Sequence, residues 1–144
     1  MRCAMAITVY QPEDNSLHLT ELYSLFLNEW GEVDPFAHEK EGLSIPTPVL
    51  ALDSQNLVGG IAFTRFAEPG TESLGVWINA LLVKPQYRRQ GISQRLIREA
   101  QQLVKREGVD TLYVYTHLPS LYEPLGWECV EQHDDHYVLS KHLN

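Results

Sequence analysis

Two segments of the sequence carry apolar residues at the spacing of an amphipathic helix. Between residues 17 and 30 they recur every three or four positions, and Gly31 follows where a helix could stop. After Gly91 the pattern is more regular, with one apolar face and polar or basic residues elsewhere. That face comprises Ile92, Leu96, Ile97, Ala100, Leu103 and Val104. We expect helices over residues 17–30 and 92–107, the second stopped by Gly108.

The other apolar runs are short and typical of β-strands. Residues 76–83 and 112–115 are almost entirely apolar, the pattern of strands buried on both faces. Gly59-Gly60 indicates a bulge in a hairpin built around a turn at residues 53–56. The remaining strands are expected over residues 6–10, 49–52, 57–66, 127–131 and 137–139. Strands interleaved with helices predict an α/β fold.

Two stretches have weaker patterns. Residues 32–48 carry prolines, glycine and acids, which predicts an irregular or briefly helical cover. Residues 120–124 are expected to form a short helix. We expect Trp30, Trp77 and Trp127 to be anchors of the core.

Composition favours one ordinary globular domain. The chain has 144 residues, of which 44% are hydrophobic and 21% charged. These proportions exclude a disordered chain, a collagen-like fibre and a coiled coil. We therefore expect residues 1–144 to form a single domain with its own core.

Charge is unevenly distributed along the chain. The 11 basic and 19 acidic residues give a net charge of −8, which argues against nucleic-acid binding and against an electrostatic membrane anchor. Residues 84–106, however, hold seven bases and one acid, so this stretch is +6 and the rest of the chain is −14. The basic stretch favours an anionic ligand, and the remaining surface favours a cation.

Signals for targeting, redox chemistry and metal binding are weak. No run approaches the ~18 apolar residues of a membrane span, and residues 1–9 lack the features of a signal peptide. Cys3 and Cys129 fit no metal or redox spacing. Residues 133–136 (His-Asp-Asp-His) have ligand chemistry, but neighbours in a strand or turn point apart, which favours a solvated turn. We expect a cytoplasmic protein with free thiols and no metal.

The basic stretch begins at a turn between a buried strand and the second helix. The first N–H groups of that helix have no partner within it, and with the helix dipole they form a site for an anion. Arg88 and Arg89 flank the site, and Gly91 would let a phosphate approach the backbone. No Lys-Ser/Thr pair and no third glycine follow, which excludes a P-loop and a dinucleotide fold. Taken alone, the turn could also be an ordinary solvated one.

A second motif downstream changes this interpretation. The first motif has the pattern Arg/Gln-x-x-Gly-x-Gly/Ala and the second the pattern Tyr-x-x-x-Gly-Phe. In this sequence Arg88, Gly91 and Ser93 occupy the positions of the first motif. Tyr122, Gly126 and Trp127 occupy those of the second. In this combination the sequence resembles the GNAT family of N-acetyltransferases, which use acetyl-CoA, over roughly residues 80–128. The resemblance implies a single GNAT-type domain with a mixed central β-sheet and helices on both faces.

The resemblance also implies roles for individual residues. The strand backbone would pair with the pantetheine arm like an added strand, and one N–H near Leu81 or Leu82 would polarise the thioester carbonyl. Tyr122 would protonate the departing thiolate as general acid. The residues expected to bind acetyl-CoA are Leu81, Leu82, Val83, Arg88, Arg89, Gln90, Gly91, Ile92, Ser93 and Gln94. Ser93 replaces the second small residue of the motif, and we expect it to be tolerated.

The general base is left open by these motifs. The strand over residues 76–83 has no carboxylate, where many family members keep a base. Asn79 could position a water that relays the proton, Glu72 precedes the strand, and His117 follows the next strand. We place Asn79 and His117 on the substrate side.

The acceptor is expected to be a primary amine. A group of acids lies in the region that borders the acceptor cleft in this family: Glu29, Glu32, Asp34, Glu39 and Glu41. They would attract a polyamine, an aminoglycoside-like compound or a basic peptide, or they serve solubility alone. Residues 22–30 and 115–117 also resemble the actin N-terminal acetyltransferase and its bacterial relatives, which indicates a peptide N-terminus.

The sequence therefore predicts transfer of acetyl from acetyl-CoA to a small cationic amine, a peptide N-terminus or a lysine by direct attack. The alternative is a non-catalytic acyl-CoA-binding sensor or interaction module on the same fold. The expected partner is a small-molecule or peptide amine, with a homodimer as a further option. Neither nucleic acid nor a membrane is expected as a partner.

Overall fold

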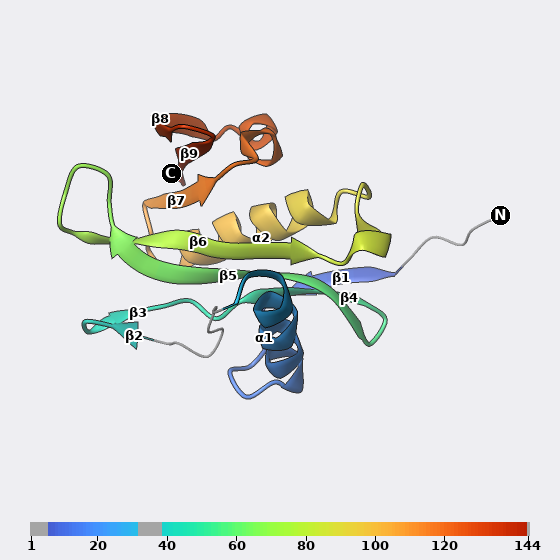
Figure 1. The fold of residues 1–144 in the computed structure, drawn as a ribbon. Helices are drawn as coiled ribbons and strands as arrows, with labels where there is room; N and C mark the ends of the chain where they lie inside the picture. The colour runs from blue at the N-terminus through green and yellow to red at the C-terminus, as the bar shows by residue number, and fades with distance from the viewer. Residues whose placement is uncertain (1–5, 32–38, 144) are drawn as a thin grey trace.

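The computed structural model describes residues 6–31 and 39–143. Figure 1 shows α-helices on opposite sides of a central sheet. The helices are α1 (Leu17–Trp30) and α2 (Ile92–Arg106), with short 3₁₀ turns η1 (Pro85–Tyr87), η2 (Pro119–Leu121) and η3 (Glu123–Leu125). The strands are β1 (Ile7–Tyr10), β2 (Glu39–Lys40), β3 (Leu43–Ser44), β4 (Val49–Asp53), β5 (Asn56–Ala67), β6 (Leu74–Val83), β7 (Thr111–Thr116), β8 (Glu128–His133) and β9 (His136–His142).

The central sheet is mixed. In the described part of the chain it has seven strands in the order β1-β4-β5-β6-β7-β9-β8, while β2 and β3 form a separate small hairpin. The pair β6 and β7 is parallel and is connected through α2, whereas the other neighbouring strands are antiparallel. This architecture confirms the predicted α/β class.

Alternate residues of β4 show that the core has two layers. Val49 and Ala51 belong to the larger apolar cluster, which contains the buried face of α2. Leu50 and Leu52 point to the other face of the sheet and belong to the cluster around α1. The two helices therefore cover opposite faces, as predicted and as Figure 1 shows.

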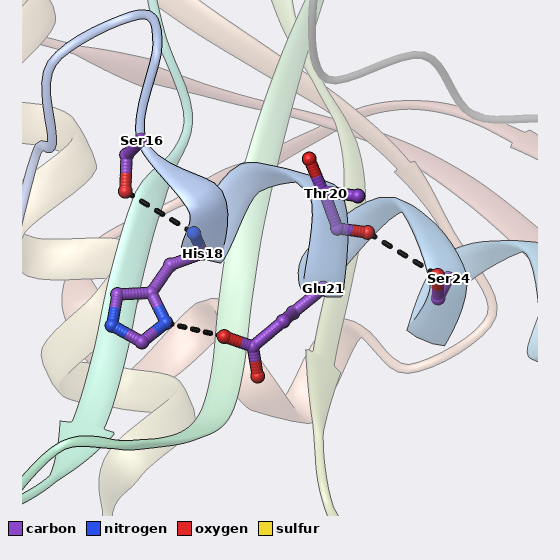
Figure 2. Close-up of polar contacts among 5 residues, drawn as sticks. All are labelled: Ser16, His18, Thr20, Glu21 and Ser24. Carbon is purple, nitrogen blue, oxygen red and sulfur yellow. Dashed lines mark hydrogen bonds and ion pairs between the residues drawn. The ribbon is translucent and has the colours of Figure 1, made fainter.

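Both helices have the predicted extents, with local causes at their ends. The Ser16 hydroxyl accepts a hydrogen bond from the His18 N–H (3.2 Å) and caps α1, and the His18 ring lies 2.7 Å from a Glu21 carboxylate oxygen (Figure 2). Gly31, with φ of 93°, ends this helix. In α2 the six predicted apolar residues are all buried. Gly108 adopts φ of 88° directly after that helix.

Strand β6 contains one extra residue, and this irregularity positions the site described below. Ala80 pairs with Ala62 and Ile78 pairs with Phe63, so Asn79 has no partner on β5 and forms a β-bulge. On its other side, β6 pairs with β7 only as far as Ile78. Beyond Ile78 the two parallel strands separate and leave an edge of β6 open.

Several local predictions were wrong. Strand β7 is not buried on both faces, because its residues alternate and Tyr115 is 54% exposed. Trp30 is not a core anchor, since it is 50% exposed at the end of α1, whereas Trp77 and Trp127 are buried as predicted. The irregularity in the β4–β5 hairpin falls at Val58, next to the glycine pair.

Two predicted segments also differ in kind. The short helix expected over residues 120–124 is replaced by the 3₁₀ turns η2 and η3, each with a proline at its start. Residues 39–44 form the β2–β3 hairpin, where an irregular or briefly helical cover was expected. Residues 32–38 lie outside the described residues.

Candidate active site

The turn before α2 leaves the N-terminus of that helix open. Gly91 adopts φ of 78°, a left-handed conformation, and has no side chain that could cap the helix. An added Cβ there would find no heavy atom within 4 Å, so the space in front of the turn is free. Arg89 is also left-handed, with φ of 64°. The result is a tight loop in front of a helix N-terminus that no side chain caps, a geometry suited to an anion.

Neighbouring strands hold this turn in place. The Tyr87 hydroxyl donates to an Asp53 carboxylate oxygen at the end of β4 (2.9 Å). The Arg88 Nε donates to the Val83 carbonyl at the end of β6 (2.8 Å). Arg88 therefore has a structural bond as well as its charge, and the turn is fixed before any ligand binds.

The open edge of β6 presents backbone groups beside the turn. The Lys84 N–H donates to the Val58 carbonyl on β5 (2.8 Å). Because antiparallel bonding repeats every second residue, Leu82 also faces β5, while Leu81 and Val83 face the gap left by β7. The Val83 carbonyl is occupied by Arg88. The backbone groups of Leu81 therefore face the opening.

A cavity of about 730 Å³, here called the turn cavity, lies between the open edge of β6, the turn and the end of α1. The predicted acetyl-CoA-binding residues that line it are Leu81, Leu82, Val83, Arg88, Arg89, Gly91, Ser93 and Gln94. The two others do not: Gln90 is exposed outside the cavity, and the Ile92 side chain is buried in the core. Glu29 and Trp30 of α1 complete the wall; the sequence had placed Glu29 at the acceptor cleft and Trp30 in the core.

A smaller cavity of about 370 Å³, the central cavity, continues the turn cavity as far as the bulge. The two share Trp30, Leu81 and His117 among their lining residues. Tyr122 and Leu81, at the open edge of β6, both line the central cavity. The site is therefore a continuous trough that runs from the turn to the bulge.

Tyr122 is held by the second motif. It is 2% exposed, and its ring meets Trp127 edge-on with centroids 5.1 Å apart at 67°. Gly126, with φ of 91°, ends η3 and lets the chain turn back so that Trp127 reaches Tyr122. The motif residues thus come together to fix one hydroxyl at the trough.

The Tyr122 hydroxyl is open to the central cavity. No described residue hydrogen-bonds it, and every fully buried polar side-chain atom of the described residues has a partner, so this oxygen is not sealed off. Burial raises the pKa of Tyr122 well above its ordinary value of 10. The hydroxyl is therefore protonated at neutral pH and can donate into the cavity.

The substrate-side predictions fall at the same place. Asn79, at the bulge, lines the central cavity, and His117 lines both cavities. Glu72 lies in the exposed loop between β5 and β6 and lines neither of them. Asn79 and His117 are thus brought together with Tyr122, while Glu72 is not.

Sequence reasoning missed His136. The segment His133-Asp134-Asp135-His136 is indeed a turn between β8 and β9, but the His136 ring lines the central cavity. It stacks on Tyr115 (centroids 4.9 Å apart) and lies 5.6 Å from His117. An Asp135 carboxylate oxygen accepts from His136 Nδ1 (2.9 Å), and this hydrogen bond lowers the pKa of Asp135. The sequence does show a histidine beside an aspartate. Whether that histidine faces the cavity depends on the register of the strands, which the sequence does not show.

The predicted acidic group does not gather at one place. Glu29 lines the turn cavity, and Glu39 and Glu41 are exposed on the β2–β3 hairpin. Glu32 and Asp34 lie outside the described residues, as does Cys3. Cys129 is an exposed free thiol.

The described ranges contain no group of three His, Cys, Asp or Glu residues arranged to hold a metal ion. Among their helices, none is long and apolar enough to cross a membrane.

Comparison with known families decides which kind of site this is. The model of the acetyltransferase (GNAT) family matches residues 9–127, most of the chain. The protein belongs to the GNAT acetyltransferase family. It is an acetyl-CoA-dependent acetyltransferase, and the resemblance seen in its two motifs is confirmed. No curated protein sequence matches it.

Solved structures support the fold. The aminoglycoside 6'-acetyltransferase type Ii is 22% identical, with a TM-score of 0.71 over 95% of this chain and 97% of that one. The PaiA N-acetyltransferase from Thermoplasma acidophilum, crystallised with coenzyme A, is 17% identical, with a TM-score of 0.69 over 96% and 99%. A chain of the NatC complex bound to Gag peptide and CoA is 19% identical, with a TM-score of 0.65 over 97% and 100%.

The turn cavity of this GNAT protein has the chemistry that coenzyme A requires. Its volume of about 730 Å³ is within the range of small-molecule and cofactor sites. The open space in front of Gly91, the free helix N-terminus and two arginines suit a pyrophosphate, and the open edge of β6 suits the amides of a pantetheine arm.

Proposed function

We propose that the protein transfers the acetyl group of acetyl-CoA to a primary amine by direct attack of the amine on the thioester. One observation carries this proposal: the open edge of β6 at Leu81 and the hydroxyl of Tyr122 line the same central cavity. This cavity continues into the turn cavity, which has the anion-binding turn at its other end. One trough therefore contains three groups that the reaction needs. They are a hydrogen-bond donor for the thioester carbonyl, a proton donor for the sulfur and a site for the pyrophosphate.

The turn cavity would bind the donor. The N–H groups at the start of α2, with the charges of Arg88 and Arg89, would hold the pyrophosphate. The backbone of Leu81 and the N–H of Val83 would pair with the pantetheine amides as a strand would. Leu81 N–H is our candidate for the donor that stabilises negative charge on the carbonyl oxygen.

When bound, acetyl-CoA supplies a thioester whose carbon–sulfur bond breaks as the amine nitrogen bonds to the carbonyl carbon. Tyr122 gives its hydroxyl proton to the departing sulfur. Because burial keeps its pKa above that of a thiol, Tyr122 releases the proton only as negative charge builds on that sulfur. It regains a proton from solvent, and the products are the amide and the free thiol.

The nitrogen must lose a proton in the same reaction. Asp135 accepts from His136 Nδ1, which leaves Nε2 of the neutral ring with a free lone pair. We assign His136 as the acceptor of this proton, with His117, whose ring centroid lies 5.6 Å away, as the group that passes it to solvent. Asn79 would orient the amine or a water between them, since it lines the same cavity.

The proposal is tested by calorimetric binding of acetyl-CoA, combined with a thiol-release assay over amines and peptides. We expect binding, and release of the thiol with at least one class of acceptor. Tight binding without release from any acceptor would overturn the enzyme mechanism in favour of an acyl-CoA-binding module. Absence of binding would overturn the role of the turn cavity.

A further inference from the structure

A third cavity of about 720 Å³ adjoins the central cavity on the side away from the turn. The two share Ile78, Asn79 and Tyr115, so the bulge of β6 separates them. This cavity, here called the aromatic groove, lies against the β5–β6 loop and the β8 strand. Apart from Asn79, none of its lining residues takes part in the proposed donor site or in the proposed proton transfers.

Aromatic rings form the walls of this groove. Phe66 meets Trp77 edge-on (5.8 Å between centroids, 90°), and Trp77 in turn stacks on Tyr113 (5.1 Å), a residue outside the lining. The Trp77 Nε1–H donates to the Phe66 carbonyl (3.1 Å), which fixes the indole orientation. Phe66 and Tyr115 are 58% and 54% exposed, so large rings face the solvent together. A concave group of exposed rings is typical of a binding surface.

Carboxylates lie within the aromatic groove. Glu68 comes from the β5–β6 loop and accepts from the Tyr113 hydroxyl (3.2 Å), and Glu131 comes from β8. Glu131 lies 2.9 Å from the His133 ring, which also lines the groove. Apart from this histidine and Tyr115, the ionisable lining residues are these two carboxylates. The groove therefore attracts a cation.

Two bases lie close to the groove but make backbone hydrogen bonds outside it. Lys40 lies over the Phe66 ring, 5.8 Å from its centroid, and its ammonium donates to the Arg65 carbonyl (3.1 Å). The Arg65 Nε donates to the Ser44 carbonyl (2.8 Å). Neither base lines the groove.

We propose that the acceptor carries a second positive charge and that the aromatic groove binds it. The reacting amine lies in the central cavity, an apolar spacer passes Asn79, and the second cation contacts the aromatic rings and the carboxylates of Glu68 and Glu131. The required chemistry is a primary amine joined through a carbon chain to an ammonium or guanidinium. A diamine and a peptide with a basic residue after its N-terminus both offer it. This inference rests on the proposed function.

The test compares a diaminopentane, with an amine at each end, against hexylamine, which has the same length and one charge. We expect the kcat/KM of the diamine to exceed that of hexylamine by about tenfold or more. Glu68→Gln and Glu131→Gln should lower kcat/KM for the diamine by a similar factor and leave hexylamine within about twofold. Glu72→Gln, in the same loop as Glu68 but outside the groove, is the matched control. A second experiment compares two short peptides that carry either arginine or leucine after the N-terminal residue. It distinguishes a basic peptide from a diamine as the source of the second charge.

Equal kcat/KM for the diamine and hexylamine, together with equal values for the two peptides, would overturn the inference. So would an equal loss for both amines in Glu68→Gln. Calorimetric binding of the diamine to the enzyme with coenzyme A separates this inference from the proposed function. If the diamine binds more tightly than hexylamine and Glu68→Gln removes the difference, the groove is supported even without turnover. If no acceptor is acetylated, the proposed function is wrong. If the diamine and hexylamine then also bind equally, the role of the groove in binding a second charge is wrong as well.

Discussion

Tyr122 packs edge-on against Trp127, with ring centroids 5.1 Å apart and an interplanar angle of 67°. The Trp127 Nε1–H donates to a Gln101 side-chain oxygen on α2 (2.8 Å). The same helix begins at the turn of Gly91. Tyr122 and the turn at Gly91, the proposed anion site, are therefore both attached to α2, which fixes their positions relative to each other.

Burial of Tyr122 predicts a loss of stability at alkaline pH. Its pKa is raised in the folded state, so above pH 10 the unfolded chain releases this proton while the folded chain retains it. This contribution to stability is complete below pH 10 and is lost as the pH rises toward the folded pKa. The free energy of unfolding should fall by about 1.4 kcal/mol per pH unit above 10 from this group alone.

Urea unfolding of the wild type and of Tyr122→Phe over the alkaline range measures this contribution. The phenylalanine variant lacks the titrating group, so its stability should decline less steeply than that of the wild type. Other groups titrate in both proteins and cancel in the difference. Parallel curves would show that Tyr122 is not protected from ionisation by burial.

The turn before α2 predicts a charge effect on donor binding. Gly91 is left-handed, and Asn and Asp are the side chains that tolerate this conformation best. Gly91→Asn and Gly91→Asp have the same size and similar backbone strain, but only the second adds a negative charge. We expect Gly91→Asp to bind acetyl-CoA about tenfold or more weakly than Gly91→Asn, and less so at high salt.

Calorimetry gives both affinities, and thermal unfolding supplies the control. Asp is a favourable residue at a helix N-terminus, so Gly91→Asp should unfold at no lower temperature than Gly91→Asn. Equal affinities of the two variants for acetyl-CoA would place the pyrophosphate elsewhere.

His136 predicts a pH-dependent loss of activity. His136→Gln removes the proposed proton acceptor and should lower kcat/KM by about 100-fold at neutral pH. The loss should shrink as the pH rises, because the acceptor amine then reaches the site unprotonated and hydroxide can take the remaining proton. His142→Gln, at the far end of the same strand, should leave the profile unchanged. A uniform loss across the pH range would indicate a structural role for His136.

The features that were best predicted from the sequence are those that depend on a single helix, strand or turn. The extent of α1 follows from its apolar spacing and from Gly31, and the buried face of α2 follows from a spacing of three and four residues. Both motifs were recognisable because each lies within a short segment. The turn at Gly91 and the loop from Tyr122 to Trp127 depend on local backbone conformation, which glycine marks in the sequence.

Features that depend on pairing between strands were not predictable in the same way. Nothing in the residues around Asn79 marks it as the bulged position, because the bulge is defined by its register against β5. His136 and Tyr115 face the trough for the same kind of reason. Trp30 was assigned to the core on its size, yet the helix ends there and the ring lies over the two cavities.

The central claim is that Tyr122 acts on the chemistry while the turn cavity binds the donor. Steady-state turnover and calorimetric acetyl-CoA binding of Tyr122→Phe test both parts on one protein. The account predicts that turnover falls by about 100-fold or more while the affinity for acetyl-CoA stays within about twofold of the wild type. Tyr23→Phe on α1, which lies outside all three cavities, should change neither value. Turnover of Tyr122→Phe that equals the wild type at neutral pH, with acetyl-CoA binding intact, would contradict the account.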